Sequence, residues 1–172
     1  TFGHYVNYTG IPSQDADADP CAVEALPDPG GQGHTEIMTA LMDNETFNQY
    51  YISRYIDLGN TVFSCDYMIA HLDSLVALIA PEMPAQVARW GSSVSTWENN
   101  GQTLKDFINE RCVEIQSGMN NCYNLNGPYD VTYDVLPAGS GNIKVNSLNL
   151  DQYEWTGSYY GGIDILLEAT PN

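Results

Sequence analysis

A helix is indicated most clearly by residues 64–81, which read SCDYMIAHLDSLVALIAP. Apolar side chains recur along this stretch at three- and four-residue intervals, the spacing that places them on one side of an α-helix. Ser64 is a residue type that caps helix N-termini, and Pro81 cannot continue a helix because it has no backbone N–H. The stretch therefore predicts a helix that begins after Ser64 and ends at Pro81.

Helical spacing continues on both sides of this segment, after an irregular, proline- and glycine-rich lead-in over residues 1–33. The further predicted helices run from Thr35 to Met42, from Asn44 to Gly59, from Pro81 to Trp90, and from Ser95 to a frayed end near Gly118. Glu98 follows Ser95 by three residues, the spacing of a capping box. The middle of the chain is therefore predicted to be helical.

The pattern changes near Asn126-Gly127-Pro128, where apolar and polar residues begin to alternate as they do in strands. Predicted strands run through residues 131–135, 143–145, 153–155 and 163–169, with a turn over 137–141. We therefore expect an α+β fold, with a lead-in and helical bundle over residues 1–126 and a small antiparallel β module over 127–172. The last strand stops where a turn should follow it, which predicts that the β module is incomplete.

The composition limits the classes of partner. The chain has 172 residues with 5 basic and 22 acidic side chains, a formal charge of −17. Nucleic-acid binding and docking on anionic membranes both depend on Lys and Arg, so we expect neither. The longest apolar run, Leu75 to Ala80, is too short for membrane insertion. The acid excess fits a secreted or high-salt protein, or one that binds cations. Together with the near absence of Lys, it predicts a secreted or cell-surface protein.

The chain contains four cysteines, Cys21, Cys65, Cys112 and Cys122. Their spacing fits no zinc site, and an even number in a secreted protein predicts two disulfides. Three connectivities are possible. We favour Cys112–Cys122 with Cys21–Cys65, because the first pair would close a short loop across a predicted helix end. Four free thiols in a cytosolic protein are the alternative.

A candidate metal site lies in the lead-in, where Asp15, Asp17 and Asp19 occupy alternate positions. Alternate acidic residues in a loop can surround a hard cation such as calcium, which binds six to eight oxygen ligands. The segment is not an EF-hand, because Pro20 and Leu26 occupy the positions that require Gly and Glu. The alternative is an acidic loop in contact with solvent only.

The remaining candidates carry less specific signals, and no catalytic serine, cysteine or histidine constellation is recognised. The arginines Arg54, Arg89 and Arg111 are expected to form ion pairs or bidentate contacts between helices, with phosphate binding as the alternative. Tyr159 and Tyr160 follow a glycine turn and could contact a glycan or protein partner at the cell surface, or be ordinary surface aromatics. Five further aromatic residues are expected to pack in the core instead: Tyr50, Tyr51, Tyr55, Trp90 and Trp97.

Several segments of the helical part carry a family resemblance. Residues 47–58, which read FNQYYISRYIDL, and residues 60–64, 69–75 and 80–91 resemble the spore coat protein H (CotH) kinase-like family, and the similarity continues through Trp97, residues 104–108 and Arg111. The resemblance implies that these segments are the C-terminal helices of a secreted, atypical protein-kinase-like domain.

The resemblance also bears on catalysis. In the family a metal-binding Asp-x-Asp segment precedes Phe-Gly, and this chain opens with Thr1-Phe2-Gly3. The metal-binding aspartates, the nucleotide-binding lysine and the catalytic aspartate are therefore expected upstream of Thr1. ATP and magnesium would bind only to the intact parent protein, and this chain alone is expected to be inactive. The alternative is a non-catalytic extracellular adhesion or structural module, stabilised by calcium and disulfides.

The β segment has a resemblance of its own. Residues 141–146, 155–162 and 165–171 look like the opening of a small bacterial surface β-repeat. Such a repeat implies a module used at the cell surface after the kinase-like domain.

Overall fold

The fold is α+β, with helices followed by small antiparallel sheets, as the sequence predicts. A computed structural model describes residues 16–23 and 34–172. The helical elements in chain order are η2 (Pro20–Val23), α1 (His34–Met42), α2 (Glu45–Gly59), α3 (Cys65–Ile79), η3 (Ala80–Glu82), α4 (Met83–Trp90) and α5 (Val94–Tyr123). The strands are β1 (Asn126–Tyr133), β2 (Gly141–Val145), β3 (Leu148–Asn149), β4 (Trp155–Gly161) and β5 (Leu167–Pro171).

Two helix starts are confirmed by their capping hydrogen bonds. The Asn44 side chain accepts the backbone N–H of Phe47 at 3.0 Å, and the Ser64 side chain accepts that of Tyr67. Each bond satisfies one of the N–H groups that the first turn of a helix leaves without a partner. The cap of α5 is corrected: Ser93, not Ser95, accepts the N–H of Thr96 at 3.0 Å.

The end of α5 also differs from the prediction. The helix does not fray near Gly118 but continues to Tyr123, where Asn124 adopts the left-handed conformation with φ 53°. Gly118 is buried under η2, and a Cβ atom added there would lie 2.3 Å from Cδ of Pro20. This glycine permits close packing between two elements and does not stop the helix.

The strands form two antiparallel sheets, β1–β4 and β3–β2–β5. The predicted strand over residues 163–169 is shifted, because β5 begins only at Leu167. Strand β3 was not predicted; it pairs with β2 through a two-residue turn at Asn146 and Ser147. Asn146 has φ 49°, the positive backbone angle that such tight hairpin turns require.

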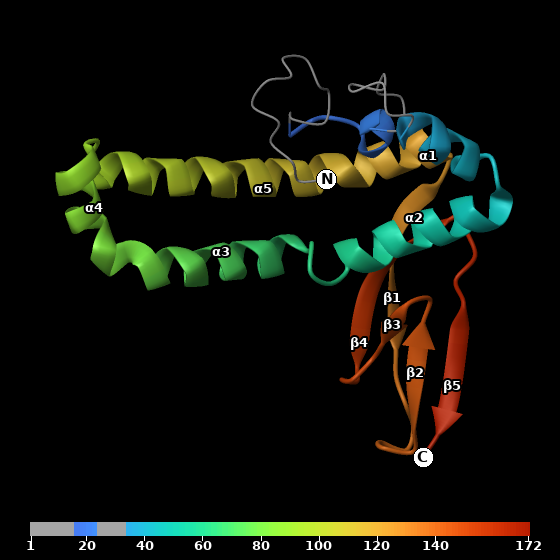
Figure 1. Cartoon of the computed structure of the whole chain (residues 1–172). Helices are drawn as coiled ribbons and strands as arrows, with labels where there is room; N and C mark the ends of the chain where they lie inside the picture. Colours follow the sequence, from blue (N-terminus) through green and yellow to red (C-terminus); the bar gives the residue numbers. More distant parts are fainter. Residues whose placement is uncertain (1–15, 24–33) are drawn as a thin grey trace.

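The helices and the sheets share one hydrophobic core. Its buried members are Ile52, Ile56, Met119, Leu125, Tyr133, Val145, Leu150, Tyr159 and Tyr160. They come from α2, from the C-terminal part of α5 and the loop after it, from β1, β2 and β4, and from Leu150, which follows β3. In Figure 1 the strands descend from the junction of α2 and α5, which is where this core lies.

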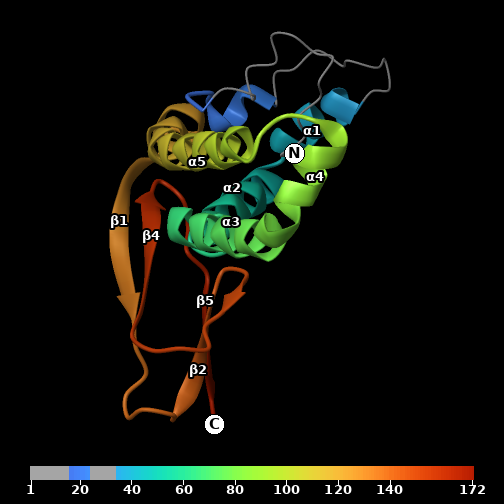
Figure 2. The same ribbon diagram turned by 90° about the vertical axis from the view of Figure 1, so that its left-hand side faces the viewer.

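The remaining helices extend away from the core. Figures 1 and 2 show α3 lying alongside the N-terminal part of α5, with α4 joining the two at the far end from the strands. None of the residues of α3 is buried in the part of the chain that the structure describes. The α3–α4–α5 hairpin is therefore a two-helix layer in which α3 stays largely exposed.

Candidate functional site

A buried carboxylate joins α2 to the β2–β3 turn. Asp57 lies on the apolar side of α2 beside Ile56, and its side chain is fully buried. Asn146 Nδ2 donates to one carboxylate oxygen at 3.2 Å. The other oxygen accepts the backbone N–H of Ser147 at 2.9 Å and its hydroxyl at 2.5 Å. A charged group without water needs such donors, so these contacts allow Asp57 to remain in the core.

Arg54 extends this network toward the surface. Its Nη1 donates to Ser147 Oγ at 2.6 Å, so the serine hydroxyl lies between the guanidinium group and the Asp57 carboxylate. No ion pair joins Arg54 to a carboxylate among the described residues. The expected ion pair of this arginine is therefore replaced by a hydroxyl-mediated contact, and most of its N–H donors are not used by that contact.

Next to this network is an open groove of about 690 Å³. One wall is the side of α2 that carries Thr46, Tyr50 and Arg54. The opposite wall is formed by the β2–β3 turn and by residues 164–166 before β5. Gln49 joins the two walls, because its Nε2 donates to the backbone carbonyl of Asp164 at 2.8 Å. The lining combines apolar surface with the Arg54 guanidinium group and two acids, the hydrogen-bonded Asp57 and the exposed Asp164. Apolar surface with a few polar groups is the usual composition of a ligand site.

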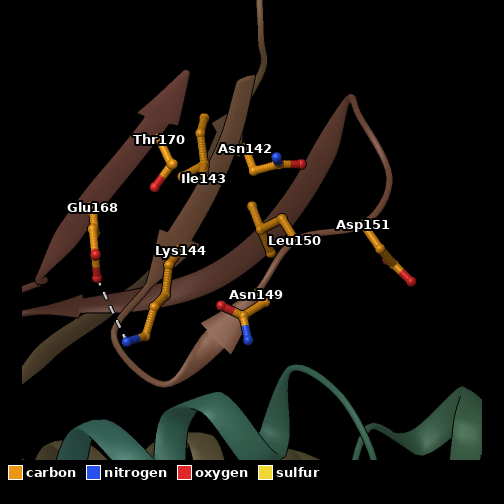
Figure 3. A pocket seen from close by; sticks show the side chains of 8 residues that line it. All are labelled: Asn142, Ile143, Lys144, Asn149, Leu150, Asp151, Glu168 and Thr170. Carbon is orange, nitrogen blue, oxygen red and sulfur yellow. Dashed lines mark ion pairs between the residues drawn. The ribbon is translucent and has the colours of Figure 1, made fainter. Parts of the chain in front are cut away.

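A second hollow of about 530 Å³ lies on the β3–β2–β5 sheet (Figure 3). Among the described residues that line it, the one cation is Lys144, whose ammonium group pairs with Glu168 at 3.6 Å. The positive charge of this hollow is therefore already neutralised. The two sites differ in this respect, because in the described structure the Arg54 guanidinium of the groove beside α2 has no carboxylate partner, whereas Lys144 has one.

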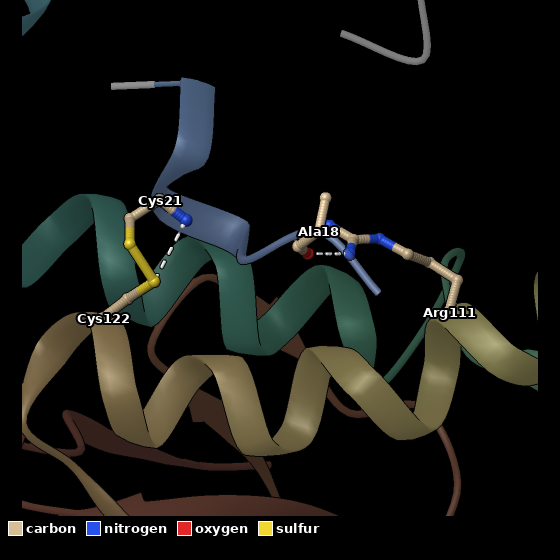
Figure 4. The surroundings of a disulfide bond; sticks show 4 residues. All are labelled: Ala18, Cys21, Arg111 and Cys122. Carbon is tan, nitrogen blue, oxygen red and sulfur yellow. Dashed lines mark hydrogen bonds between the residues drawn. A yellow bond between two sulfur atoms is a disulfide. The ribbon is translucent and has the colours of Figure 1, made fainter. Parts of the chain in front are cut away.

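Arg111 holds the segment that carries the predicted calcium ligands on α5. Its guanidinium group donates to the backbone carbonyl of Ala16 at 3.2 Å and to that of Ala18, the contact drawn in Figure 4. Asp17 and Asp19 are exposed, and Asp15 lies outside the described residues. In the described part of the chain no group of three or more metal-ligating side chains is brought together. The calcium site stays a prediction.

Two disulfides are present, as predicted, but the favoured pairing is wrong. Cys21 bonds to Cys122, and Cys65 bonds to Cys112. Cys112 and Cys122 both lie in α5, ten residues apart, which separates their Cα atoms by about 15 Å in a helix. A disulfide spans less than about 7 Å between Cα atoms, so the helix excludes that pairing. The observed bonds fasten η2 and α3 to α5.

Four aromatic residues lie elsewhere than expected. Tyr159 and Tyr160 are 2% and 7% exposed, so they are core residues and cannot form the predicted partner surface. Burial raises the pKa of both phenols, and the Asp57 carboxylate raises that of Tyr159 further. Conversely, Tyr50 and Trp90, expected in the core, are 62% and 69% exposed. Tyr51 and Tyr55 do pack against the core.

The exposed side of α3 is unusually apolar. Tyr67 and Leu75 are about half exposed, and Leu78 is three-quarters exposed. They follow the same side of the helix with His71, whose ring stacks on Tyr67 at 5.9 Å. A helix that is apolar on nearly all sides is normally buried. We call the side formed by Tyr67, His71, Leu75 and Leu78 the outer face of α3. No helix in the described residues has the length and apolar content to cross a membrane.

The helical segments identify the family. Residues 24–115 match the model of the CotH kinase protein family. The chain belongs to the CotH kinase family. The CotH match contains α1 to α4 and most of α5, whereas β1–β5 follow it in sequence. No curated protein and no solved structure matches the chain.

Sequence reasoning missed the residues that form the groove beside α2. Asp57, Asn146 and Ser147 were not recognised as a group, although each carried a local signal. Asp57 interrupts an apolar helix side, and Asn146 and Ser147 separate two short apolar stretches in the way a tight turn does. Tertiary structure decides which acidic side chain contacts which turn, because Asp57 and Ser147 are 90 positions apart in sequence.

Proposed function

We propose that this chain is the C-terminal helical portion of a secreted CotH-like atypical protein kinase, followed by a β surface module. On this proposal the groups that bind ATP and magnesium and transfer phosphate belong to a part of the protein outside this sequence. The outer face of α3 is the observation that carries the proposal. Helix α3 is as apolar as a buried helix, yet many of its side chains are exposed in this structure. We expect this combination where another part of the domain, outside this sequence, packs against the helix.

The positions of the two lysines support the same proposal. A kinase uses a lysine to hold the nucleotide phosphates. Lys105 pairs with Asp73 between α5 and α3, and Lys144 pairs with Glu168 between β2 and β5. Both ammonium groups therefore already have a carboxylate partner, and each has a role in holding two elements together.

Calorimetry with ATP and Mg²⁺ tests the catalytic part of the proposal. The chain alone should give no heat of binding above background. The same chain expressed with the reading frame upstream of Thr1 should bind ATP, and its α3 backbone amides should exchange with deuterium more slowly. Micromolar ATP affinity of the chain alone would contradict the proposal, as would unchanged exchange in the longer protein.

A non-catalytic extracellular module is the second candidate, and the two disulfides that fasten η2 and α3 to α5 favour it. Calcium binding at Asp15, Asp17 and Asp19 would add to that stabilisation. Arg111 occupies the Ala16 and Ala18 carbonyls, so the cation would depend on the carboxylates. Millimolar calcium should then raise the melting temperature, and Asp17→Ala should remove most of the rise. Equal melting temperatures in calcium and in chelator would reject the calcium site.

A further inference from the structure

The groove beside α2 has the size and lining of a small-molecule site. Its volume of about 690 Å³ falls within the range of ligand pockets, roughly 300–1,000 Å³. Tyr50 and Leu166 line it and are 62% and 68% exposed, so a ligand there would cover apolar surface that is now in water. Thr46 and Gln49 add hydrogen-bonding groups to the same wall. Shape and apolar area therefore favour a compact organic molecule.

Arg54 decides the charge of that molecule. Every other lysine and arginine among the described residues has a different use: Lys105 and Lys144 pair with carboxylates, Arg111 binds backbone carbonyls, and Arg89 lies over the Trp90 ring. Arg54 lines the groove with only the Ser147 hydroxyl as a hydrogen-bond partner in the described structure. A guanidinium group has five N–H donors in a planar fork that matches a carboxylate or phosphate.

The Asp57 network holds Arg54 in place. Ser147 Oγ is fixed by its hydrogen bond to the buried Asp57 carboxylate, and it accepts from Nη1 of Arg54 at 2.6 Å. One donor of the arginine is thereby tied to the β2–β3 turn, which reduces the side-chain entropy that binding would otherwise cost. The other donors remain for a ligand. This arrangement differs from a flexible surface arginine, which loses more freedom when it binds.

The charge of the whole protein restricts the ligand further. With a formal charge of −17, the chain repels polyanions such as nucleic acids and sulfated polysaccharides at long range. Among anionic ligands, one with a single charged group meets the least repulsion, including that from the exposed acid Asp164 of the lining, and it needs only one guanidinium. We propose that the groove beside α2 binds a small molecule with one carboxylate or phosphate group on an apolar or aromatic body, with the oxyanion at Arg54 and the body against Tyr50 and Leu166.

The proposal can be tested with three probes of similar shape: benzoate, phenyl phosphate and neutral benzamide. Each is titrated into the full chain labelled with ¹⁵N, and the backbone amide shifts are followed by NMR. At least one of the two anions should bind saturably and shift amides in residues 46–57 and 164–166, and comparison of benzoate with phenyl phosphate assigns the anion. Benzamide should bind at least tenfold more weakly. Equal affinity for benzamide, or saturable shifts elsewhere only, would overturn the proposal.

Substitutions test whether the carboxylate or phosphate of the bound probe lies at Arg54. Arg54→Gln should raise the dissociation constant at least tenfold, whereas the matched control Lys144→Gln, which removes the cation of the other hollow, should leave it unchanged. If Arg54→Gln unfolds the chain, Tyr50→Ala replaces it, because an exposed ring can be truncated without loss of the core. Unchanged affinity in Arg54→Gln, or in Tyr50→Ala when it is the replacement, would overturn the proposal, as would the absence of saturable binding by either anion.

Discussion

The carboxylate of Asp57 and the backbone N–H of Ser147 form a hydrogen bond of 2.9 Å between residues 90 positions apart in sequence. The bond fastens the β2–β3 turn to α2, and it brings Arg54 and Tyr50 opposite residues 164–166 in one groove. The helical part of the chain and its sheets are therefore joined by a buried polar network as well as by the shared apolar core.

Removal of the Asp57 carboxylate should destabilise the fold strongly. Asp57→Ala leaves the Asn146 amide and the Ser147 N–H without their acceptor, at a cost of roughly 3 kcal/mol in the free energy of unfolding. Urea denaturation followed by circular dichroism measures this difference. Asp151→Ala changes an exposed acid and should stay within about 0.5 kcal/mol of the parent chain. Equal stabilities of the two variants would show that the network is not formed.

The pairing of the cysteines can be read directly by mass spectrometry. Digestion of the non-reduced protein with Glu-C should give peptides linked through Cys21–Cys122 and through Cys65–Cys112. Replacing both Cys65 and Cys112 by Ser should lower the free energy of unfolding by about 4 kcal/mol, because a long loop is no longer closed in the unfolded chain. A peptide linked through Cys112–Cys122 would contradict the continuous helix α5.

Two glycines of α5 should respond in opposite directions to alanine. Gly118→Ala places a methyl group 2.3 Å from Cδ of Pro20, and overpacking of this kind costs about 1–3 kcal/mol. Gly101→Ala meets no atom within 4 Å and should stabilise the helix by about 1 kcal/mol. Thermal melts of both variants make the comparison. Stabilisation by Gly118→Ala would mean that η2 does not pack on α5.

Alkaline pH should destabilise the protein through its buried tyrosines. Burial raises the pKa of Tyr133, Tyr159 and Tyr160 in the folded state above the ordinary value of 10. Above pH 10 the unfolded chain therefore binds fewer protons than the folded one, so the free energy of unfolding falls as pH rises. Below pH 10 the effect is absent. Melting temperatures between pH 9 and pH 11.5 measure the slope.

Tyr159→Phe should flatten that decline, because it removes one of the phenols responsible. At pH 7 the variant should be as stable as the parent or slightly more stable, since the buried Tyr159 hydroxyl has no hydrogen-bond partner in the described structure. Loss of more than about 1 kcal/mol at pH 7 would show instead that the hydroxyl has a bound partner such as water. Urea denaturation of the variant and the parent chain at pH 7 and pH 11 measures the difference in their free energies of unfolding at each pH.

The local features of this protein can be predicted from its sequence. Helix starts at Asn44 and Ser64 were predictable because a side-chain oxygen caps an N–H group only three residues away. The boundary near Asn126 was predictable because the hydrophobic period changes from helical to alternating there. The family was also recognisable, because its segments follow one another in order along the helices. Each of these signals lies within a few consecutive residues.

The long-range partners of residues depend on how the whole chain packs. The cysteine pairing, the contact of Gly118 with Pro20 and the burial of Tyr159 each depend on which distant segment packs against a residue. The same is true of the groove, since Arg54 and Ser147 meet only when the β2–β3 turn lies on α2. Sequence periodicity reports which side of an element is apolar, but it does not report what covers that side. Packing of the whole chain settles that question, because partners far apart in sequence leave no local pattern.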